Sequence, residues 1–428
     1  MVLIAPLAGY VVSSVQAEAV AALPYDVFTI KEAADEIANY PESFLRIDRT
    51  TALLPELDEY DPQVYQKAKQ ILQSSIASNQ YQQEQNRFYL YRMAWPKSDI
   101  ADKVESSIPP DSAISDTHNI QIGLMAAVAT EDYRNNIIRR HENTRTEKLQ
   151  DRVDHINTLG VQASPVLMTH RTDLSIKQLH SELMAASDPY IDFISVDDIR
   201  HTVWIIDSSL NQQVIQTYQS LDTLYIADGH HRAEAASTIK ADGIFAILFP
   251  ADMLQIHAYN RVVEDLNGLT EEQFLEQVRQ YYSVQIISAE PSEKIQPIQR
   301  GQIAMHMHGS WYQLQLNEQI RSTDALAALD VSILQSSVLK PLLGIDDPKE
   351  STRITYVGGS LGIQGLVQRM ATFERQPGEA LAFALHAVDM DDFFAVADSG
   401  QLMPPKSTWF APKPRSGIVM MAQNVLQE

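Results

Sequence analysis

The chain contains no cysteine among its 428 residues, and this absence excludes disulfide bonds, thiolate zinc sites and cysteine nucleophiles together. Basic residues are also scarce. The chain has 33 lysines and arginines against 55 acidic residues, so its formal net charge is −22. A field of that sign repels nucleic acids and acidic membranes, so we expect no nucleic-acid partner and no membrane association.

Long apolar runs are missing as well. Beyond the first 20 residues, no stretch of 18 or more apolar residues occurs, so no membrane-spanning segment is predicted. The first 20 residues are apolar, but no basic residue precedes them and Pro6 and Gly9 interrupt them. We interpret them as a strand and a loop, with a secretory signal peptide as the alternative, and we expect a cytoplasmic protein.

Strand-like and helix-like segments are mixed along the whole chain, which predicts an α/β (mixed α+β) fold. A chain of this length predicts two or three domains or lobes. The hydrophobic pattern changes near residues 249–260, so we place the lobes at 1–255 and 256–428. The expected helices include 62–80, 144–160, 270–282 and 330–344, and the expected strands include 86–93, 163–170, 223–227 and 381–388.

The stretch LYIADGHHRAEAAS, residues 224–237, joins an apolar strand to an alanine-rich helix. The start of such a helix presents unpaired backbone N–H groups and the positive end of the helix dipole, which together favour an anion. Gly229 allows close approach of the backbone, Arg232 offers a forked donor, and His230 and His231 can donate hydrogen bonds or transfer protons. The alternative is that Asp228 simply caps the helix.

A second polar cluster, residues 137–152, also follows a strand and opens a helix. Glu142 beside His141 is a candidate general base, and neighbouring arginines could hold an anion. A solvated helix start is the alternative. The candidate phosphate ligands of this cluster are Arg139, Arg140, His141 and Thr144.

A third cluster, MPPKSTWFAPKPRSG at 403–417, gathers cations and hydroxyls behind a rigid pair of prolines. No glycine-rich turn precedes the Lys-Ser-Thr, so the segment is not a P-loop. Lys406, Ser407, Thr408 and Lys413 are candidate phosphate ligands, with a basic surface tail as the alternative. Three cationic clusters in so acidic a chain predict one converging site for a phosphate-bearing ligand.

One weaker pattern is His306-Met-His308, whose spacing would place both rings on one face of a strand. Without a third ligand in the pattern, we favour a solvated strand face over a metal site and predict no protein metal centre.

The quoted motifs resemble a known family. ADGHHR, PYDV, RHENT, YNRVVEDLNGL, LDVSIL and MPPKSTWFAPKPRSG are similar to segments of the family called domain of unknown function 1015, in the same order from about residue 20 to 420. The Asp-Gly-x-His-Arg element is in turn similar to the nucleotide-binding signature of the ParB and sulfiredoxin-like fold. The resemblance implies a ParB/sulfiredoxin-like core and a second α/β lobe that returns the 403–408 loop to the site.

Within that wider group, sulfiredoxin chemistry is excluded because the chain has no cysteine, and the helix-turn-helix of partition proteins is not found. The remaining analogy, to kinases that phosphorylate free serine, implies phosphoryl transfer between ATP or ADP and a small substrate such as serine or phosphoserine. Mg²⁺ would accompany the nucleotide.

The analogy also gives roles to the candidate residues. Asp228, Gly229, His230, His231 and Arg232 would hold phosphates, and His230 would also take part in catalysis. Lys406 and Arg140 would neutralise charge on the transferred group. Glu142 is the first candidate base and Asp228 the second.

Two other functions stay open. A phosphatase-like hydrolase would act on phosphoserine in the same pocket, with water as the nucleophile, and a ParB-like regulator would bind nucleotide without catalysis. The donor, the exact substrate, the direction of the reaction and the oligomeric state do not follow from the sequence.

Overall fold

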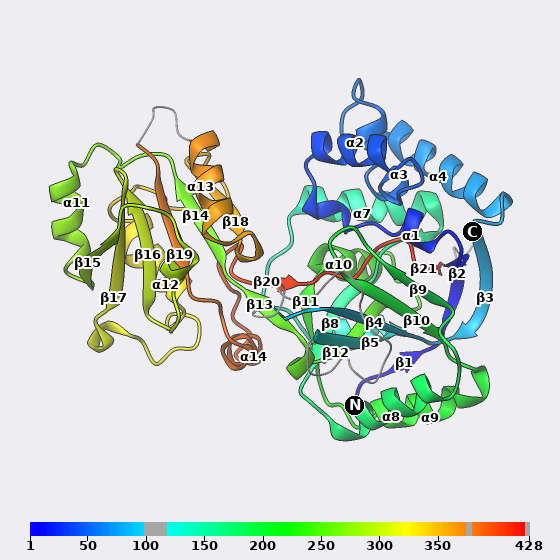
Figure 1. Ribbon diagram of the computed structural model, residues 1–428. Helices are drawn as coiled ribbons and strands as arrows, with labels where there is room; N and C mark the ends of the chain where they lie inside the picture. Colours follow the sequence, from blue (N-terminus) through cyan, green and yellow to red (C-terminus); the bar gives the residue numbers. More distant parts are fainter. Residues whose placement is uncertain (98–117, 374–378, 424–428) are drawn as a thin grey trace. The chain divides into compact units, whose positions relative to one another are not determined.

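The computed structural model describes residues 1–97, 118–373 and 379–423, and the fold is mixed α and β (Figure 1). The chain divides into two compact units. Unit 1 comprises Met1–Leu254 together with Pro412–Glu428, and unit 2 comprises Gln255–Ala411. The last segment, which the sequence placed with the second lobe, therefore belongs to unit 1, where one of its strands pairs with N-terminal strands.

Unit 1 is built on a nine-stranded mixed sheet in the order β6-β11-β8-β12-β5-β4-β10-β9, with β1 added beside β5. The strands are β1 (Ile4–Ala5), β4 (Tyr89–Pro96), β5 (His118–Val128), β6 (Ile138–Arg139), β8 (Val166–His170), β9 (Ile191–Ile194), β10 (Arg200–Ile205), β11 (Leu224–Asp228) and β12 (Ile244–Pro250). Strands β6 and β11 are parallel, so their carboxyl ends meet at one edge of the sheet.

The helices of unit 1 pack around this sheet and around each other, and their apolar residues recur at helical spacing. They are α1 (Ala17–Val20), α2 (Ile30–Asn39), α3 (Leu45–Asp48), α4 (Pro62–Ala77), α6 (Thr130–Arg134), α7 (Thr146–Leu159), α8 (Leu174–Ala185), α9 (Asn211–Tyr218) and α10 (His230–Thr238). Gly160 ends α7 in the left-handed conformation that glycine favours, as the sequence predicted.

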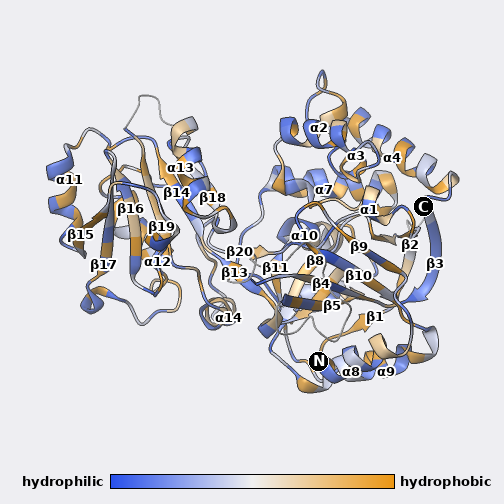
Figure 2. Ribbon diagram, viewed as in Figure 1, coloured by the Kyte–Doolittle hydropathy of each residue, from blue (hydrophilic) through white to orange (hydrophobic). Residues whose placement is uncertain are grey.

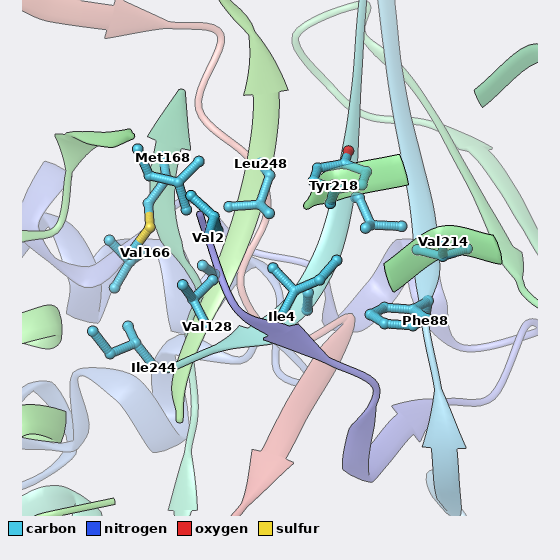
Figure 3. Packing of buried hydrophobic residues seen from close by; sticks show 14 of the residues in the cluster. Val2, Ile4, Phe88, Val128, Val166, Met168, Val214, Tyr218, Ile244 and Leu248 are labelled. Atoms are coloured by element: carbon cyan, nitrogen blue, oxygen red, sulfur yellow. The ribbon is translucent and has the colours of Figure 1, made fainter. Parts of the chain in front are cut away.

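The core of unit 1 lies between the sheet and its helices (Figure 3). Val2 and Ile4 of the N-terminal segment pack there with Phe88, Leu248 and Tyr218, and all five side chains are buried. The apolar N-terminal segment is therefore part of the folded core, which agrees with its interpretation as a strand and a loop.

A second sheet of unit 1, in the order β3-β2-β21-β7, receives the C-terminal segment. Its strands are β2 (Leu7–Val12), β3 (Tyr81–Arg87), β7 (Val161–Gln162) and β21 (Val419–Ala422). Strand β3 is mostly hydrophilic and forms an edge, whereas β21 is buried between β2 and β7 (Figure 2). Residues 419–422 are thus a structural part of unit 1.

Unit 2 has a six-stranded sheet in the order β15-β17-β16-β19-β14-β18 and a separate pair, β13-β20. The strands are β13 (Gln255–His257), β14 (Tyr259–Val263), β15 (Tyr282–Ser288), β16 (Gln302–Met307), β17 (Ser310–Leu316), β18 (Ile354–Gly358), β19 (Leu381–Leu385) and β20 (Trp409–Ala411). The helices are α11 (Glu271–Val278), α12 (Asp330–Leu334), α13 (Gly362–Phe373) and α14 (Met390–Asp398). A hairpin turns at His308 and Gly309, as the sequence predicted.

Candidate functional site

The DGHHR turn of unit 1 opens helix α10 without a side-chain cap. Gly229 occupies the cap position with φ of 93°, and it has no side chain that could accept a hydrogen bond from the first amides of the helix. Asp228 therefore does not cap the helix, because its carboxylate is engaged elsewhere. The amides at this helix start remain donors for a ligand.

The Asp228 carboxylate joins two cations. Its Oδ1 lies 2.9 Å from Lys413 Nζ, and its Oδ2 accepts a hydrogen bond from Arg232 Nη2 at 3.0 Å. Burial alone would raise the pKa of Asp228, but Lys413 and Arg232 outweigh burial and lower that pKa below its ordinary range. An anion held this firmly is a weak base, so Asp228 fits the orientation of its two cations better than proton abstraction.

Arg232 is folded back over the turn. Its side chain is buried, Nη1 donates to the carbonyl of Pro165, and a Cβ added to Gly229 would lie 2.9 Å from Arg232 Nε. Glycine is therefore required at residue 229 for two reasons, its positive φ and the arginine packed against it. The alanines of α10 that follow are buried and allow close packing against α7.

Two buried histidines meet beside the turn because β6 and β11 end together. The rings of His141 and His230 lie edge to face with centroids 4.6 Å apart, and His141 Nδ1 donates to the carbonyl of Ile226 at 3.0 Å. Burial lowers the pKa of His141 to about 4 and that of His230 well below its ordinary value. Both rings are therefore neutral near pH 7. The role of His230 in proton transfer stays a prediction.

His230 Nε2 is buried and has no hydrogen-bond partner among the described residues. Buried polar atoms are nearly always hydrogen-bonded, so a bare ring nitrogen beside an uncapped helix start indicates a ligand atom or a water. Burial and Lys148 lower the pKa of His231 to about 4, and its Nε2 accepts from the amide of Arg145 at 2.9 Å. The neutral ring of His231 thus carries its hydrogen on Nδ1.

The other residues predicted in unit 1 surround these groups less tightly. Thr144 donates to Glu234 of α10, Arg139 and Glu142 are half-buried, and Arg140 is exposed. The loop from β6 to α7 is thus tied to α10 at Thr144 and at Arg145, the residue whose amide binds His231.

Lys406, Ser407 and Thr408 lie in unit 2. Lys406 Nζ lies 3.3 Å from Tyr259 Oη, and Ser407 Oγ donates to the carbonyl of Pro404 at 2.6 Å. Their predicted convergence with the DGHHR turn stays a prediction. Lys413, the remaining member of that cluster, contacts Asp228 directly.

A buried polar network next to the turn was not predicted from the sequence. Asp48 contacts Arg152 Nη1 at 3.2 Å and accepts from Ser164 Oγ at 2.7 Å, and Ser164 also contacts Ser416. Asp48, Arg152 and Ser164 line a hollow together with Arg232. More than 100 residues separate Asp48 from Arg152 in the chain, so no local motif could reveal the pair.

Arg415, one of the cations of the third cluster in the sequence, is buried in a hydrogen-bonded network. Its guanidinium bonds to Asp197 and to Ser195, and its amide lies 3.2 Å from Tyr91 Oη. His201 closes this network through Tyr91 and Ser195. All of these groups are mutually hydrogen-bonded, so we assign the network to holding the C-terminal segment in place.

No group of three or more His, Asp or Glu side chains that could hold a metal ion occurs in residues 1–97, 118–373 and 379–423. His308 lies in the hairpin turn, not in the strand that carries His306, and its Nδ1 contacts Glu271 at 2.9 Å. The metal-binding interpretation of the His-Met-His pattern therefore gains no support. Within the same ranges, no helix combines the length and the apolar character needed to cross a bilayer.

The family model described as "Protein of unknown function (DUF1015)" matches residues 4–108 and 110–332. The chain belongs to this family. No curated protein matches the chain.

Among solved structures, the chain is similar to a free serine kinase in complex with AMP, at 12% identity and a TM-score of 0.34, over 64% of this chain and 84% of that one. It is also similar to C-terminally truncated SbnI from Staphylococcus aureus, at 10% identity and a TM-score of 0.37, over 68% and 84%. A conserved hypothetical protein from Pyrococcus furiosus is similar at 14% identity and a TM-score of 0.33, over 65% of this chain and 90% of that one. These likenesses are weak, so functional roles have to be argued from the residues of the site.

Proposed function

We propose that unit 1 binds the phosphates of ATP or ADP at the start of α10, and that the protein transfers a phosphoryl group between this nucleotide and serine or a similar small amino acid. One observation carries the proposal. The helix start at Gly229 is uncapped, and the buried Nε2 of His230 beside it has no partner among the described residues. Phosphate oxygens can bind both the free helix amides and His230 Nε2, because they accept hydrogen bonds from amides and from a neutral imidazole N–H.

The charges around the turn suit an anion. Lys413 and Arg232 together carry two positive charges, and Asp228 neutralises one of them. Asp26 also acts on Arg232 and stabilises its charged form. The placement of the two cations at the positive end of the helix dipole favours a polyphosphate, while Asp228 keeps both cations in place before the ligand arrives. Because these groups are largely buried, their interaction with phosphate is weakly screened by salt.

In the proposed reaction, the substrate hydroxyl oxygen forms a bond to the terminal phosphorus, and the bond from that phosphorus to the nucleotide oxygen breaks. Glu142 takes the hydroxyl proton, because Asp228 is held as a weak base and His141 is neutral and buried. Arg140 would neutralise charge on the transferred group. Mg²⁺ would reach the site with the nucleotide and depend mainly on phosphate oxygens and water, since Asp228 is committed to its two cations.

The binding part is tested by titration calorimetry of the full chain with ADP. Arg232→Ala should weaken ADP binding by roughly 1.5–3 kcal/mol, the range for a hydrogen bond to a charged group. Gly229→Ala should weaken it as well, because the new methyl group would displace Arg232. Lys177→Ala, which breaks a surface ion pair with Asp252, is the matched control and should leave affinity unchanged.

Equal ADP affinity in Arg232→Ala and in the unmodified protein would refute the phosphate site.

The reaction is tested by incubating the protein with labelled phosphoserine, with and without ADP. Transfer of label to ADP supports the proposal. Release of free phosphate without ADP would indicate the hydrolase, and ADP binding without turnover would indicate the regulator.

A further inference from the structure

A second cationic group lies in unit 2, around Arg261 of β14. The side chain is 2% exposed. Among the described residues, its hydrogen bonds go only to main-chain carbonyls, from Nη1 to Tyr259 at 2.6 Å and from Nη2 to Lys406 at 3.3 Å. The guanidinium also lies over the ring of Tyr356, 5.6 Å from its centroid. Within the described residues, no carboxylate lies within salt-bridge distance of Arg261.

Lys406 adds a second positive charge to the same place. Its side chain is exposed, and its Nζ lies 5.1 Å from the centre of the Tyr259 ring and 3.3 Å from the hydroxyl of that ring. In the part of the chain that the structure describes, Lys406 likewise forms no salt bridge. Trp409 packs edge to face against Tyr259, with centroids 5.1 Å apart, and so supports the ring beneath the lysine.

Two adjacent cations without a counter-ion are unexpected in a chain with 55 acidic and 33 basic residues. Burying a charge without a partner costs several kcal/mol, so a protein gains from keeping one only where a ligand neutralises it. Arg261 and Tyr259 also fix the loop around Lys406. Arg261 donates a hydrogen bond to the main-chain carbonyl of Lys406, and the Tyr259 hydroxyl accepts one from the ammonium group of Lys406.

A neighbouring hollow does not remove this excess of positive charge. Tyr259 and Ser407 line it together with Asp330 and Asp392. Asp392 lies 3.2 Å from Arg300, and Asp330 lies 3.3 Å from Arg321. The third acid of the hollow, Asp389, accepts a hydrogen bond from the amide of Asp392. Within the described residues, none of the three acids forms a salt bridge with Arg261 or Lys406.

We propose that Arg261 and Lys406 form a phosphate-binding site of unit 2, in which Lys406 contacts the ligand and Arg261 positions Lys406 from behind. The ligand class is a phosphate monoester. The two negative charges of such a ligand match the two cations. Lys406 binds as a point charge. Arg261 cannot form a bidentate pair with a carboxylate, because its Nη1 and Nη2 already donate to two main-chain carbonyls. The choice of O-phosphoserine as the physiological monoester rests on the proposed function.

The test uses the full chain carrying Arg232→Ala, so that the site in unit 1 is disabled. Titration calorimetry with inorganic phosphate and with O-phospho-L-serine should still detect one binding site. Adding Lys406→Met should weaken that binding at least tenfold, and adding Arg261→Met should weaken it severalfold, with recovery in Arg261→Lys. Arg279→Met, an exposed arginine of the same unit, is the control and should change nothing.

A second measurement separates a role in binding from a role in folding. Acetylation of Lys406, followed by mass spectrometry, should be slowed by phosphate in the Arg232→Ala protein and not slowed when Arg261→Met is added, while the melting temperature stays the same. If Arg232→Ala alone abolishes all phosphate binding, or Lys406→Met leaves it intact, the unit 2 site is refuted and the proposed nucleotide site stands. If ADP binds normally to Arg232→Ala and requires Lys406, the unit 1 site fails and the unit 2 site stands.

Discussion

Buried arginines are neutralised in different ways in the two units. In unit 1, Arg152 contacts Asp48 and Asp151, at 3.2 and 2.7 Å, and Arg232 contacts Asp228. Burial alone would lower the pKa of Arg152, but Tyr25 and the two carboxylates raise it overall. In unit 2, burial lowers the pKa of Arg261 to about 10. Unit 1 therefore supplies its own counter-ions, whereas unit 2 leaves a charged guanidinium for a ligand to neutralise.

The largest expected effect breaks the unit 1 arrangement. Arg152→Met removes the cation and leaves Asp48 and Asp151 without it, and both side chains are largely buried. Removing one partner of a buried ion pair typically costs 3–5 kcal/mol, so we expect a loss of about that size in the free energy of unfolding of unit 1. Urea unfolding followed by circular dichroism measures it.

The control for this change is Lys177→Ala, which breaks an exposed ion pair with Asp252 and should cost less than about 1 kcal/mol. A double variant in which Asp48→Asn accompanies Arg152→Met should recover part of the lost free energy of unfolding, because only one of the two carboxylates then lacks its cation. An Arg152→Met protein as stable as the control would show that unit 1 does not depend on internal charge matching.

A separate effect is the dependence of the stability of unit 1 on pH. Burial lowers the pKa of His141 to about 4 and that of His180 and His201 to about 3, all in unit 1. These rings are neutral in the folded protein but protonate near pH 6.5 when unfolded, so the unfolded state binds more protons between pH 6.5 and 4. The stability of unit 1 is therefore full above pH 6.5 and falls as the pH drops, on the order of 3 kcal/mol per fully buried ring by pH 4.

Asp228 adds a later loss. Its pKa is lowered in the folded state, so its contribution is present above its ordinary pKa of 3.8 and disappears only as the pH falls below about 4. Urea midpoints at pH 7, 6, 5 and 4 test both parts. His141→Gln should flatten the dependence between pH 6.5 and 4, and a midpoint that stays constant over that range would contradict the assignment of neutral rings.

Local patterns predicted most of the fold, because hydrophobic periodicity and turn glycines report on neighbours in the chain. The helix ending at Gly160, the strand before Asp228 and the hairpin at His308 all follow from such patterns. The candidate site was proposed from one continuous motif, the DGHHR turn, and its function stays a prediction. The C-terminal strand β21 was not recognised, because its pairing depends on β2, about 400 residues away.

The charge partners were not predictable for the same reason. Asp48 and Arg152 are 104 positions apart, and nothing in the residues around either one indicates the other. Arg261 stands inside YNRVV, where an alternating strand pattern gives it the appearance of a solvent-facing residue. Whether a buried arginine has a carboxylate is a property of the folded chain, so only the structure separates Arg261 from Arg152.

The smallest expected effect on stability is at Arg261 itself. Arg261→Met removes an uncompensated buried charge, which favours the folded state, and leaves the carbonyls of Tyr259 and Lys406 without their donor, which opposes it. We expect the two to offset to within about 1 kcal/mol, in contrast to the loss at Arg152→Met, although both changes delete a buried guanidinium. Matched urea curves for the two variants make the comparison directly. A loss of 3 kcal/mol or more at Arg261→Met would mean that unit 2 supplies a counter-ion after all, and an unmatched charge would then no longer distinguish the two units.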